Sequence, residues 1–479
     1  MKTEKFDGKK ALIMGLGLNG GGVESARYLA SLGAKVTVTD LRDEKTLAAS
    51  IEKLQSLQIR FVLGSHNIED FRKADIVIKN PGVKPDSPFL KEAKRVETDI
   101  SLFLAGCPAR LVAITGSKGK STTAAALHHV LKESRAKGEM KGEAFLGGNI
   151  AISPLGFLSG LKENDDVVLE LSSWQLGDLR GRNILKPRAA IITSIMKDHL
   201  DRYSSMEEYI SDKRLIYQNQ DEKDIIVASN DDWGKSFHRE SRGRPLVYSG
   251  EPLDKGIAGG WIDSKGSGIA RLWGTPFEKS NHINYAAGQN NGCIVEIVPA
   301  RLLIPGYHQK LNLLAAALAL LDLGLEGGFI RDSLGRFPGI EHRLEYFHES
   351  RGIRFYNDSA ATIPEAAAAA VAAFPAPPLL VCGGTDKELD FTPLVKAAAK
   401  AREIILIAGT GSEKLKKLLD EGGVKYHGPF DSLEAVIKAI RETAIPGDNA
   451  VLSPGCTSFG MFLNEFDRGT KWKEAIRNI

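Results

Sequence analysis

Cysteine, long apolar runs and an excess of one charge are all scarce in this chain, and each scarcity excludes a class of protein. The 479 residues include four cysteines, far apart and without a CxxC pair, which argues against a disulfide framework and against a zinc site. No stretch reaches the roughly 18 apolar residues that cross a bilayer. The apolar run at residues 11–14 is too short for a signal peptide. We therefore expect a cytoplasmic protein without a membrane-spanning segment.

The balance of charge excludes a further class. The formal net charge is +3 with no long basic run, so neither a nucleic-acid groove nor an anionic-membrane surface is indicated. Hydrophobic residues make up 43% and charged residues 26%, as in ordinary soluble globular proteins. Because domains usually span roughly 100–200 residues, the length predicts two to four of them, with three as the prior expectation.

Strand and helix patterns alternate along three segments of the chain. Apolar runs predict strands at residues 11–14, 35–39, 75–78, 111–114, 166–171, 189–193, 225–228, 353–357, 379–382, 403–408 and 450–453. Helical patterns occupy residues 23–32, 121–132, 206–219, 309–323 and 365–373, whereas the glycine-rich stretch at 250–268 predicts turns and short antiparallel strands. This alternation predicts an α/β protein with largely parallel sheets.

A phosphate-binding loop is predicted at residues 115–122, TGSKGKST, between a strand and a helix. Glycines let backbone N–H groups turn toward phosphate oxygens, and the helix N-terminus adds positive potential. Lys120 can neutralise the terminal phosphates and the Ser121 hydroxyl can ligate Mg²⁺. The loop is shorter than the common Walker A pattern, which has a glycine where this chain has Ile114.

A second glycine-rich turn, Gly15-x-Gly17-x-x-Gly20, follows the first predicted strand, and Asp40 ends the next one. This spacing is typical of NAD-binding proteins. The same physics suits any nucleotide diphosphate, because backbone N–H groups do not distinguish between nucleotides. A dehydrogenase stays open as an alternative, and it predicts NAD(P)H binding without ATP consumption.

The short phosphate loop resembles that of the Mur ligases and of their relative folylpolyglutamate synthetase, and further motifs follow in the order of that family. They are GLGLNG (15–20), TDLR (39–42), NPG (80–82), GGN (147–149), ELSSWQ (170–175), DHLDR (198–202), GYHQKLN (306–312), HRLE (342–345), NDS (357–359), GGTDK (383–387) and LSPGCTSF (452–459). The N-terminal motifs are most similar to the D-glutamate-adding branch of the family.

The resemblance implies three α/β domains. We expect an N-terminal Rossmann-like parallel sheet that binds a UDP substrate at residues 1–106. A central P-loop ATPase-like domain follows at 107–340. A C-terminal Rossmann-like domain that meets the amino acid and ATP follows at 341–479.

The resemblance also implies roles for individual residues. The UDP substrate would meet Leu18, Asn19, Asp40, Leu41, Arg42, Asn80 and Gly82. ATP would meet Gly116, Ser117, Lys118, Gly119, Lys120, Ser121, Thr122, Asn312, Arg343 and Asp358. The incoming amino acid would meet Thr362, Lys387 and Ser458. Metal would be held by Ser121, Glu170, His199 and a carbamylated Lys213, and catalysis would involve Lys120, Asn149, His199 and Lys213.

Each of these residues also has a plainer interpretation. Glu170 could be an ordinary acid at a strand end, His199 a structural histidine, and Lys213 a solvated lysine on an amphipathic helix. The family supplies the functional interpretation, in which CO₂ converts Lys213 from a cation into a carboxylate-like ligand.

The implied activity is ATP-dependent addition of D-glutamate to UDP-N-acetylmuramoyl-L-alanine through an acyl phosphate, in peptidoglycan precursor synthesis. Two Mg²⁺ ions are expected, with Mn²⁺ as an alternative, and the enzyme is expected to be a monomer. Ala360 replaces the lysine of the usual KAT and Gly460 replaces an aspartate, so a different acceptor amino acid stays open. Gln309 replaces an asparagine that approaches the adenine in the family, which changes the geometry expected for that contact. An inactive UDP-sugar-binding protein would require loss of a central catalytic residue, and the candidates are all present.

Overall fold

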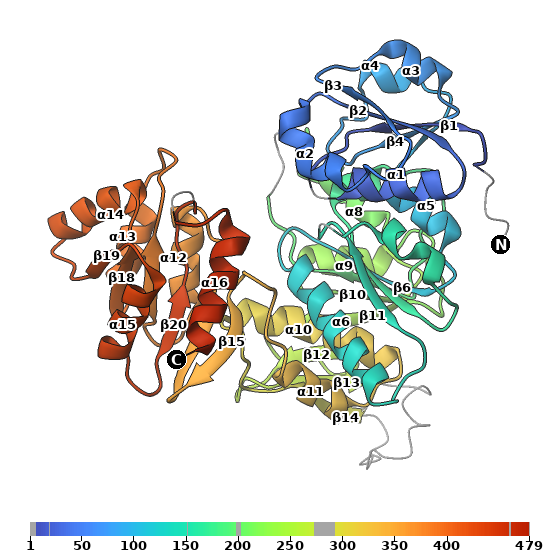
Figure 1. Ribbon diagram of the computed structural model, residues 1–479. Helices are drawn as coiled ribbons and strands as arrows, with labels where there is room; N and C mark the ends of the chain where they lie inside the picture. Colours follow the sequence, from blue (N-terminus) through green and yellow to red (C-terminus); the bar gives the residue numbers. More distant parts are fainter. Residues whose placement is uncertain are drawn as a thin grey trace. The chain divides into compact units, whose positions relative to one another are not determined.

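The computed structural model describes residues 6–18, 20–150, 152–197, 203–272, 293–458 and 461–478 (Figure 1). The chain forms two compact units. The first unit comprises Met1–Val298 and Leu311–Ser333, and the second comprises Pro299–Lys310 and Leu334–Ile479.

The N-terminal sheet of the first unit has five parallel strands in the order β3-β2-β1-β4-β5. Its strands are β1 (Lys10–Met14), β2 (Lys35–Asp40), β3 (Arg60–Leu63), β4 (Ile76–Lys79) and β5 (Val96–Glu97). Its helices are α1 (Gly21–Ser31), α2 (Glu44–Glu52), α3 (Ile68–Lys73), α4 (Pro88–Lys91) and α5 (Asp99–Gly106). Strand β1 is apolar and buried after its exposed first residue, Lys10, because both faces of the strand are covered. Ile13 packs into the core with α1 and α5, whereas Leu12 packs with Phe71 of α3 and Leu90 of α4.

The central sheet has nine strands in the order β14-β13-β12-β11-β10-β9-β6-β8-β7. They are β6 (Arg110–Thr115), β7 (Ala144–Gly148), β8 (Asp166–Glu170), β9 (Ala189–Ile192), β10 (Ile225–Ser229), β11 (Arg244–Ser249), β12 (Gly259–Ile262), β13 (Gly268–Leu272) and β14 (Cys293–Val298). The helices are α6 (Lys120–Ala136), η1 (Pro154–Gly156), η2 (Leu158–Gly160), α7 (Ser173–Gly177), α8 (Met206–Arg214), α9 (Asp232–Glu240), α10 (Tyr307–Asp322) and α11 (Gly327–Gly335). Only the pairs β12–β13 and β13–β14 are antiparallel among the described strand pairs of this sheet.

One continuous hydrophobic core joins the two sheets of the first unit. It contains Ile13 of β1, Phe103 of α5, Leu155 of η1 and Leu169 of β8. Helix α5 also packs against η1. The N-terminal and central sheets therefore form one packed body.

The second unit carries a six-stranded sheet in the order β15-β16-β20-β17-β18-β19, in which only β15 is antiparallel to its neighbour. Its strands are β15 (Glu345–Ser350), β16 (Ile353–Asn357), β17 (Leu379–Gly383), β18 (Glu403–Ile407), β19 (His427–Phe430) and β20 (Asn449–Leu452). Its helices are α12 (Pro364–Ala373), α13 (Thr392–Ala398), α14 (Thr410–Glu421), α15 (Leu433–Thr443) and α16 (Glu465–Arg477). One core packs α12, α13 and α14 on one face of the sheet, and a separate core packs α15 and α16 on the other.

The α/β class predicted from the sequence is confirmed. Of the short antiparallel strands predicted at 250–268, β12 lies within that stretch, and its antiparallel partner β13 begins at the last residue of the stretch. The helix predicted at 206–219 ends at Arg214, because the chain tightens into single turns there. Short edge elements such as β5 and β19 carry too few apolar residues to be predicted. No helix among the described residues is long and apolar enough to span a bilayer.

Candidate active site

The phosphate loop lies between β6 and α6, as predicted, and its glycines are structurally required. Gly116 and Gly119 have φ values of 145° and 91°, in the region that favours glycine. A Cβ on Gly116 would lie 1.9 Å from Thr193 Oγ1, and one on Gly119 would lie 2.2 Å from Asn312 Oδ1. The second contact places Asn312 of α10 against the loop. Ser121 and Thr122 lie in the first turn of α6.

The strand register gathers polar groups at this end of the central sheet. Glu170 of β8 pairs with Ile114 of β6 on one side and with Gly148 of β7 on the other. The carboxyl ends of parallel strands thus place the loop, Glu170 and Asn149 side by side. Asn149 Nδ2 donates to Glu170 Oε1 at 3.1 Å.

Glu170 has one satisfied and one unsatisfied oxygen. Its side chain is 1% exposed, and Oε2 has no hydrogen-bond partner among the described residues. A buried carboxylate oxygen without a donor is costly unless something positive meets it. No group of three His, Cys, Asp or Glu side chains suited to a metal occurs in the described parts of the chain. A cation at Glu170 would therefore need ligands of other kinds as well.

Two lysines converge on one carbonyl of the phosphate loop. Lys120 Nζ donates to Gly116 O at 3.0 Å and to Ser117 O at 2.9 Å. Lys213 Nζ donates to the same Gly116 O at 2.9 Å and lies 4.4 Å from the centre of the Tyr209 ring. Lys213 is 1% exposed, so it is not the solvated helix lysine of the plainer interpretation. Two ammonium groups at one oxygen repel each other and give this end of the loop a strong positive potential.

The other loop residues hold the turn against the segment after β9. Ser117 N donates to Ser194 O at 2.8 Å, and Thr193 Oγ1 donates to Lys118 O at 2.6 Å. His199, predicted to join the metal site, lies outside the described residues, as does Asn19. Their placement stays a prediction.

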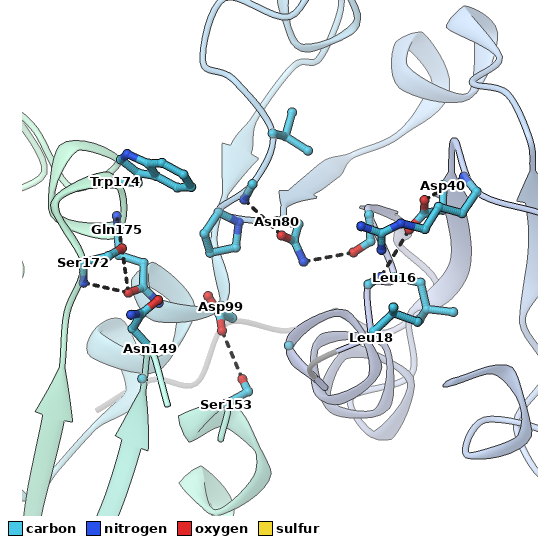
Figure 2. A pocket seen from close by; sticks show the side chains of 18 of the residues that line it. Leu16, Leu18, Asp40, Asn80, Asp99, Asn149, Ser153, Ser172, Trp174 and Gln175 are labelled. Carbon is cyan, nitrogen blue, oxygen red and sulfur yellow. Dashed lines mark hydrogen bonds between the residues drawn. The ribbon is translucent and has the colours of Figure 1, made fainter. Parts of the chain in front are cut away.

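A cavity of about 660 Å³ lies in the first unit between the glycine turns of the N-terminal sheet and the end of the central sheet (Figure 2). All of the described residues expected to meet the UDP substrate line it: Leu18, Asp40, Leu41, Arg42, Asn80 and Gly82. Leu18 and Leu41 are 54% and 67% exposed, so two apolar side chains at the cavity are accessible to a ligand. On the opposite side the cavity reaches Asn149.

Two side chains shape the turns that line this cavity. Asp40 accepts from Gly17 N at 3.2 Å through one oxygen and from Arg42 N at 3.0 Å through the other. Asn80 accepts from Gly82 N at 3.1 Å, and its Nδ2 donates to Gly15 O at 3.4 Å. Asp40 and Asn80 therefore hold the backbone of three neighbouring loops in place.

Sequence patterns did not point to His66 and Asp99, which also line the cavity. His66 contacts Thr39 Oγ1 at 2.7 Å, and burial lowers the pKa of its imidazole. Asp99 is buried, which raises the pKa of its carboxyl. Ser172 and Gln175 form a capping box at the start of α7, a signal that the S-x-x-Q spacing carries. His66 and Asp99 have no comparable local signal.

In the second unit, the residues expected to bind the amino acid lie on three loops that are hydrogen-bonded together. The loops follow β16, β17 and β20, which are neighbours in the sheet. Gly455 N donates to Ala361 O at 2.9 Å, and Thr385 N donates to Thr457 O at 3.0 Å. Thr362, Lys387 and Ser458 are thus carried on one end of this sheet. Gly460 lies outside the described residues.

Asp358 braces the segment that contains Arg343. Its oxygens accept from Ser453 Oγ at 2.6 Å and from Leu344 N at 3.1 Å. Burial raises the pKa of its carboxyl to about 6. Arg343 is exposed, and its backbone N–H donates to Ile340 O at 3.0 Å within this braced segment.

The chain matches three family models in order. Residues 9–101 match the MurD-like N-terminal domain of Mur ligases, residues 114–320 the Mur ligase middle domain, and residues 342–456 the glutamate ligase domain of Mur ligases. Among curated proteins, UDP-N-acetylmuramoylalanine--D-glutamate ligase of Treponema pallidum (strain Nichols) is 37% identical over 99% of this chain and 98% of its own length. The protein of that name from Roseiflexus sp. (strain RS-1) is 39% identical over 98% and 99%.

Among solved structures, UDP-N-acetylmuramate-alanine ligase MurC from Thermotoga maritima aligns with a TM-score of 0.56 and 20% identity, over 98% of this chain and 99% of that one. MurF from Acinetobacter baumannii aligns with a TM-score of 0.53 and 14% identity, over 98% and 93%. These likenesses confirm the three-domain α/β fold. The sequence identity to the curated relatives extends over nearly the full length of the chain, including every motif region. The chain therefore belongs to the Mur ligase family.

Proposed function

We propose that this chain is an ATP-dependent ligase that adds D-glutamate to UDP-N-acetylmuramoyl-L-alanine during peptidoglycan precursor synthesis. The relatives from Treponema pallidum and Roseiflexus carry the name of that activity and match nearly the whole chain. We further propose that the enzyme is cytoplasmic and monomeric, and that its three domains span residues 1–106, 107–340 and 341–479.

One observation carries the proposal beyond the resemblance. Asn149 lines the cavity that holds the UDP-substrate candidates and also donates to Glu170 beside the phosphate loop. A ligand whose nucleotide lies on the glycine turns could extend along this cavity and bring its far end to Asn149. A UDP-linked sugar with a terminal carboxylate has that form, and its carboxylate would arrive where ATP phosphates are expected.

A divalent metal is part of the proposal, and the residues fit it. The unpartnered Glu170 Oε2 is a hard oxygen ligand of the kind that Mg²⁺ prefers. Ser121 would add its hydroxyl, Lys213 a carbamate formed with CO₂, and His199 would complete the set. Two Mg²⁺ ions, or Mn²⁺, would neutralise charge on the phosphoryl group during transfer.

The chain's own residues would act by positioning and charge neutralisation. The ammonium group of Lys120 would leave the loop carbonyls and bind the terminal phosphates of ATP. Arg343 and Asn312 would bind the remainder of the nucleotide. The substrate carboxylate would take the γ-phosphoryl group, which gives an acyl phosphate and ADP. The amine of D-glutamate, held by Lys387, Ser458 and Thr362, would attack the acyl carbon, lose a proton and expel phosphate.

The experiment is phosphate release from ATP with Mg²⁺ and UDP-N-acetylmuramoyl-L-alanine, compared for D-glutamate, L-glutamate and no amino acid. Release with D-glutamate alone is the expected result. Release with L-glutamate or another amino acid would support the mechanism but change the acceptor specificity. The departures from the family pattern at Ala360 and Gly460 make this a specific alternative. No release with any acceptor from folded protein would contradict the proposal.

A further inference from the structure

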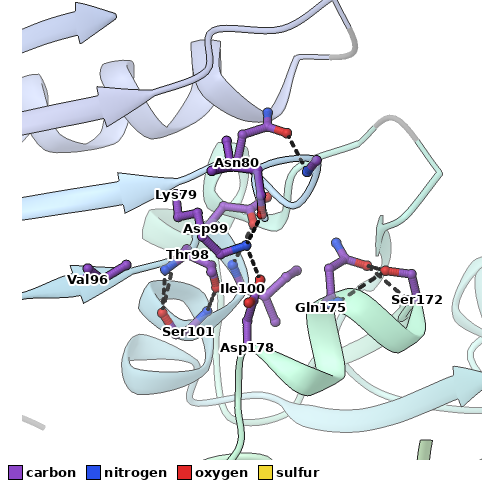
Figure 3. A network of polar contacts seen from close by, with 12 residues as sticks. Lys79, Asn80, Val96, Thr98, Asp99, Ile100, Ser101, Ser172, Gln175 and Asp178 are labelled. Atoms are coloured by element: carbon purple, nitrogen blue, oxygen red, sulfur yellow. Dashed lines mark hydrogen bonds and ion pairs between the residues drawn. The ribbon is translucent and has the colours of Figure 1, made fainter. Parts of the chain in front are cut away.

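A buried ion pair joins the two sheets of the first unit. Lys79 is the last residue of β4 in the N-terminal sheet, and Asp178 follows α7 of the central sheet. Lys79 Nζ lies 2.8 Å from Asp178 Oδ2, with side chains only 4% and 7% exposed (Figure 3). A charged pair withdrawn from water this far is strongly destabilised when either partner is lost.

A second ion pair of opposite polarity crosses the same junction. Arg182, four positions after Asp178, pairs with Glu97 of β5 and donates to Val96 O at 2.6 Å. Arg182 Nε also donates to Asp178 O at 3.1 Å. The turn after α7 is therefore fixed to two adjacent strands of the N-terminal sheet, through one acidic and one basic residue.

Both partners of the buried pair adjoin residues that line the cavity. Lys79 directly precedes Asn80, and its Nζ also donates to Val83 O at 3.0 Å, so it holds both ends of the turn at 80–83. Asp178 directly follows the helix whose Trp174 and Gln175 line the opposite wall. The ion pair thus connects the two walls of the cavity, although neither of its residues lines the cavity.

Lys79 also offsets a local excess of negative charge. Asp99 lines the cavity, accepts from Ile100 N at 2.8 Å and from Ser153 Oγ at 3.2 Å, and is buried. Burial raises the pKa of its carboxyl, and repulsion from Asp178 adds to this shift. Removing Lys79 would take away the cation that lies 2.8 Å from Asp178 Oδ2, beside a second buried acid.

We propose that Lys79 and Asp178 are a positioning pair that fixes the separation of the two cavity walls, so that a ligand spanning both walls is held in register with the phosphate loop. The identity of that ligand, a UDP-linked sugar peptide, rests on the proposed function. The positioning role does not require the pair to touch the ligand.

The experiment compares Lys79→Met, Asp178→Asn, the double variant and Lys79→Arg with the wild type. Lys186→Met is the matched control, because Lys186 pairs with Asp221 at 2.5 Å on the surface, with side chains 51% and 48% exposed. Two affinities are measured in each variant: KM for UDP-N-acetylmuramoyl-L-alanine and the Kd of UDP alone by calorimetry. UDP serves as the short probe because it lacks the part of the substrate that reaches the central sheet.

We expect KM for the full substrate to rise about 10- to 100-fold in each single variant, the scale of a small misplacement remote from the reacting atoms. The Kd of UDP should rise much less than the KM for the full substrate, because UDP lacks the part that reaches the second wall. The KM for ATP should stay within about twofold, and Lys79→Arg should recover most of the loss. The double variant should lose no more than the worse single variant, since the two changes break one interaction. Equal losses for UDP and the full substrate, or additive losses, would overturn the proposal.

Hydrogen exchange tests the pair without any substrate and separates it from the proposed function. Amides at 80–83 and at 172–178 should exchange faster together in Lys79→Met and Asp178→Asn, and be unchanged in Lys186→Met. If only one of the two segments responded, the pair would not couple the walls. If the wild type released no phosphate yet both segments responded, the proposed function would fail while the positioning role stood.

Discussion

At the scale of single residues, burial distinguishes Lys213 from an ordinary surface lysine. Lys213 lies on a helix with an exposed polar face, yet its Nζ is inside the protein against Gly116 O. As an ammonium it competes with Lys120 for that carbonyl. As a carbamate it would carry the opposite charge and attract both Lys120 and a metal at Glu170.

The first residue-scale prediction concerns this lysine. Lys213→Ala should abolish phosphate release, because it removes both the carbamate and the ligand that it would offer to the metal. Added short carboxylic acids should restore part of the activity by occupying the vacated space. The measurement is phosphate release across a series of formate and acetate concentrations.

Arg214→Ala is the control for that prediction. Arg214 is the next residue of α8, and it forms surface ion pairs with Glu207 and Glu240, which contribute little to stability. The activity of the Arg214→Ala variant should stay near that of the wild type and should not respond to added carboxylic acids. Normal ATP and metal binding in Lys213→Ala, without any rescue, would count against the carbamate.

At the scale of elements, α16 is anchored to the loops of the second unit by one buried arginine. Arg468 is 1% exposed and donates to Ser359 Oγ and Ser359 O, both at 2.9 Å, and to Cys456 O at 3.2 Å. Burial lowers the pKa of its guanidinium to about 10, which still leaves it protonated at neutral pH. The helix therefore holds in place the loops that follow β16 and β20.

Arg468→Met should destabilise the second unit by about 2–4 kcal/mol, because several buried acceptors lose their donor at once. Lys471→Met on the same helix should change stability by less than about 1 kcal/mol, since its pair with Asp467 is exposed. Urea unfolding followed by tryptophan fluorescence measures both, because Trp472 is buried in this core. Equal effects of the two changes would contradict the anchoring role.

At the scale of the whole molecule, the chain folds as two units although its family has three domains. The N-terminal and central sheets share one hydrophobic core and are linked by the Lys79–Asp178 and Glu97–Arg182 pairs. Elements that share a core open together, so these two sheets should behave as one cooperative body.

Calorimetry should therefore show two thermal transitions, one for each unit. UDP at about 100 times its Kd should stabilise the first unit by about 2.7 kcal/mol and leave the second unchanged. Hydrogen exchange should slow at α6 of the central sheet as well as at β1, although UDP is expected to bind the N-terminal sheet. Three separate transitions, or protection confined to the N-terminal sheet, would refute a single first unit.

The sequence alone determined the α/β class and the position of the phosphate loop. It also placed the described substrate-binding candidates, which the structure gathers around one cavity. These features were predictable because each depends on a strand, a turn and a helix contiguous in the chain. Backbone conformation at Gly116 and Gly119 and the strand-end position of Glu170 follow from such local patterns.

Only the tertiary structure decided the burial of Lys213, the bracing role of Asp358, the anchoring of α16 by Arg468 and the pairing of Lys79 with Asp178. Each involves groups that are far apart in the chain, and their meeting depends on strand order, register and the packing of one sheet against another. The local sequence around a charged residue does not indicate whether its side chain will face water or another charge. Its partner is fixed only when distant strands align, which is why long-range electrostatics had to be observed rather than predicted.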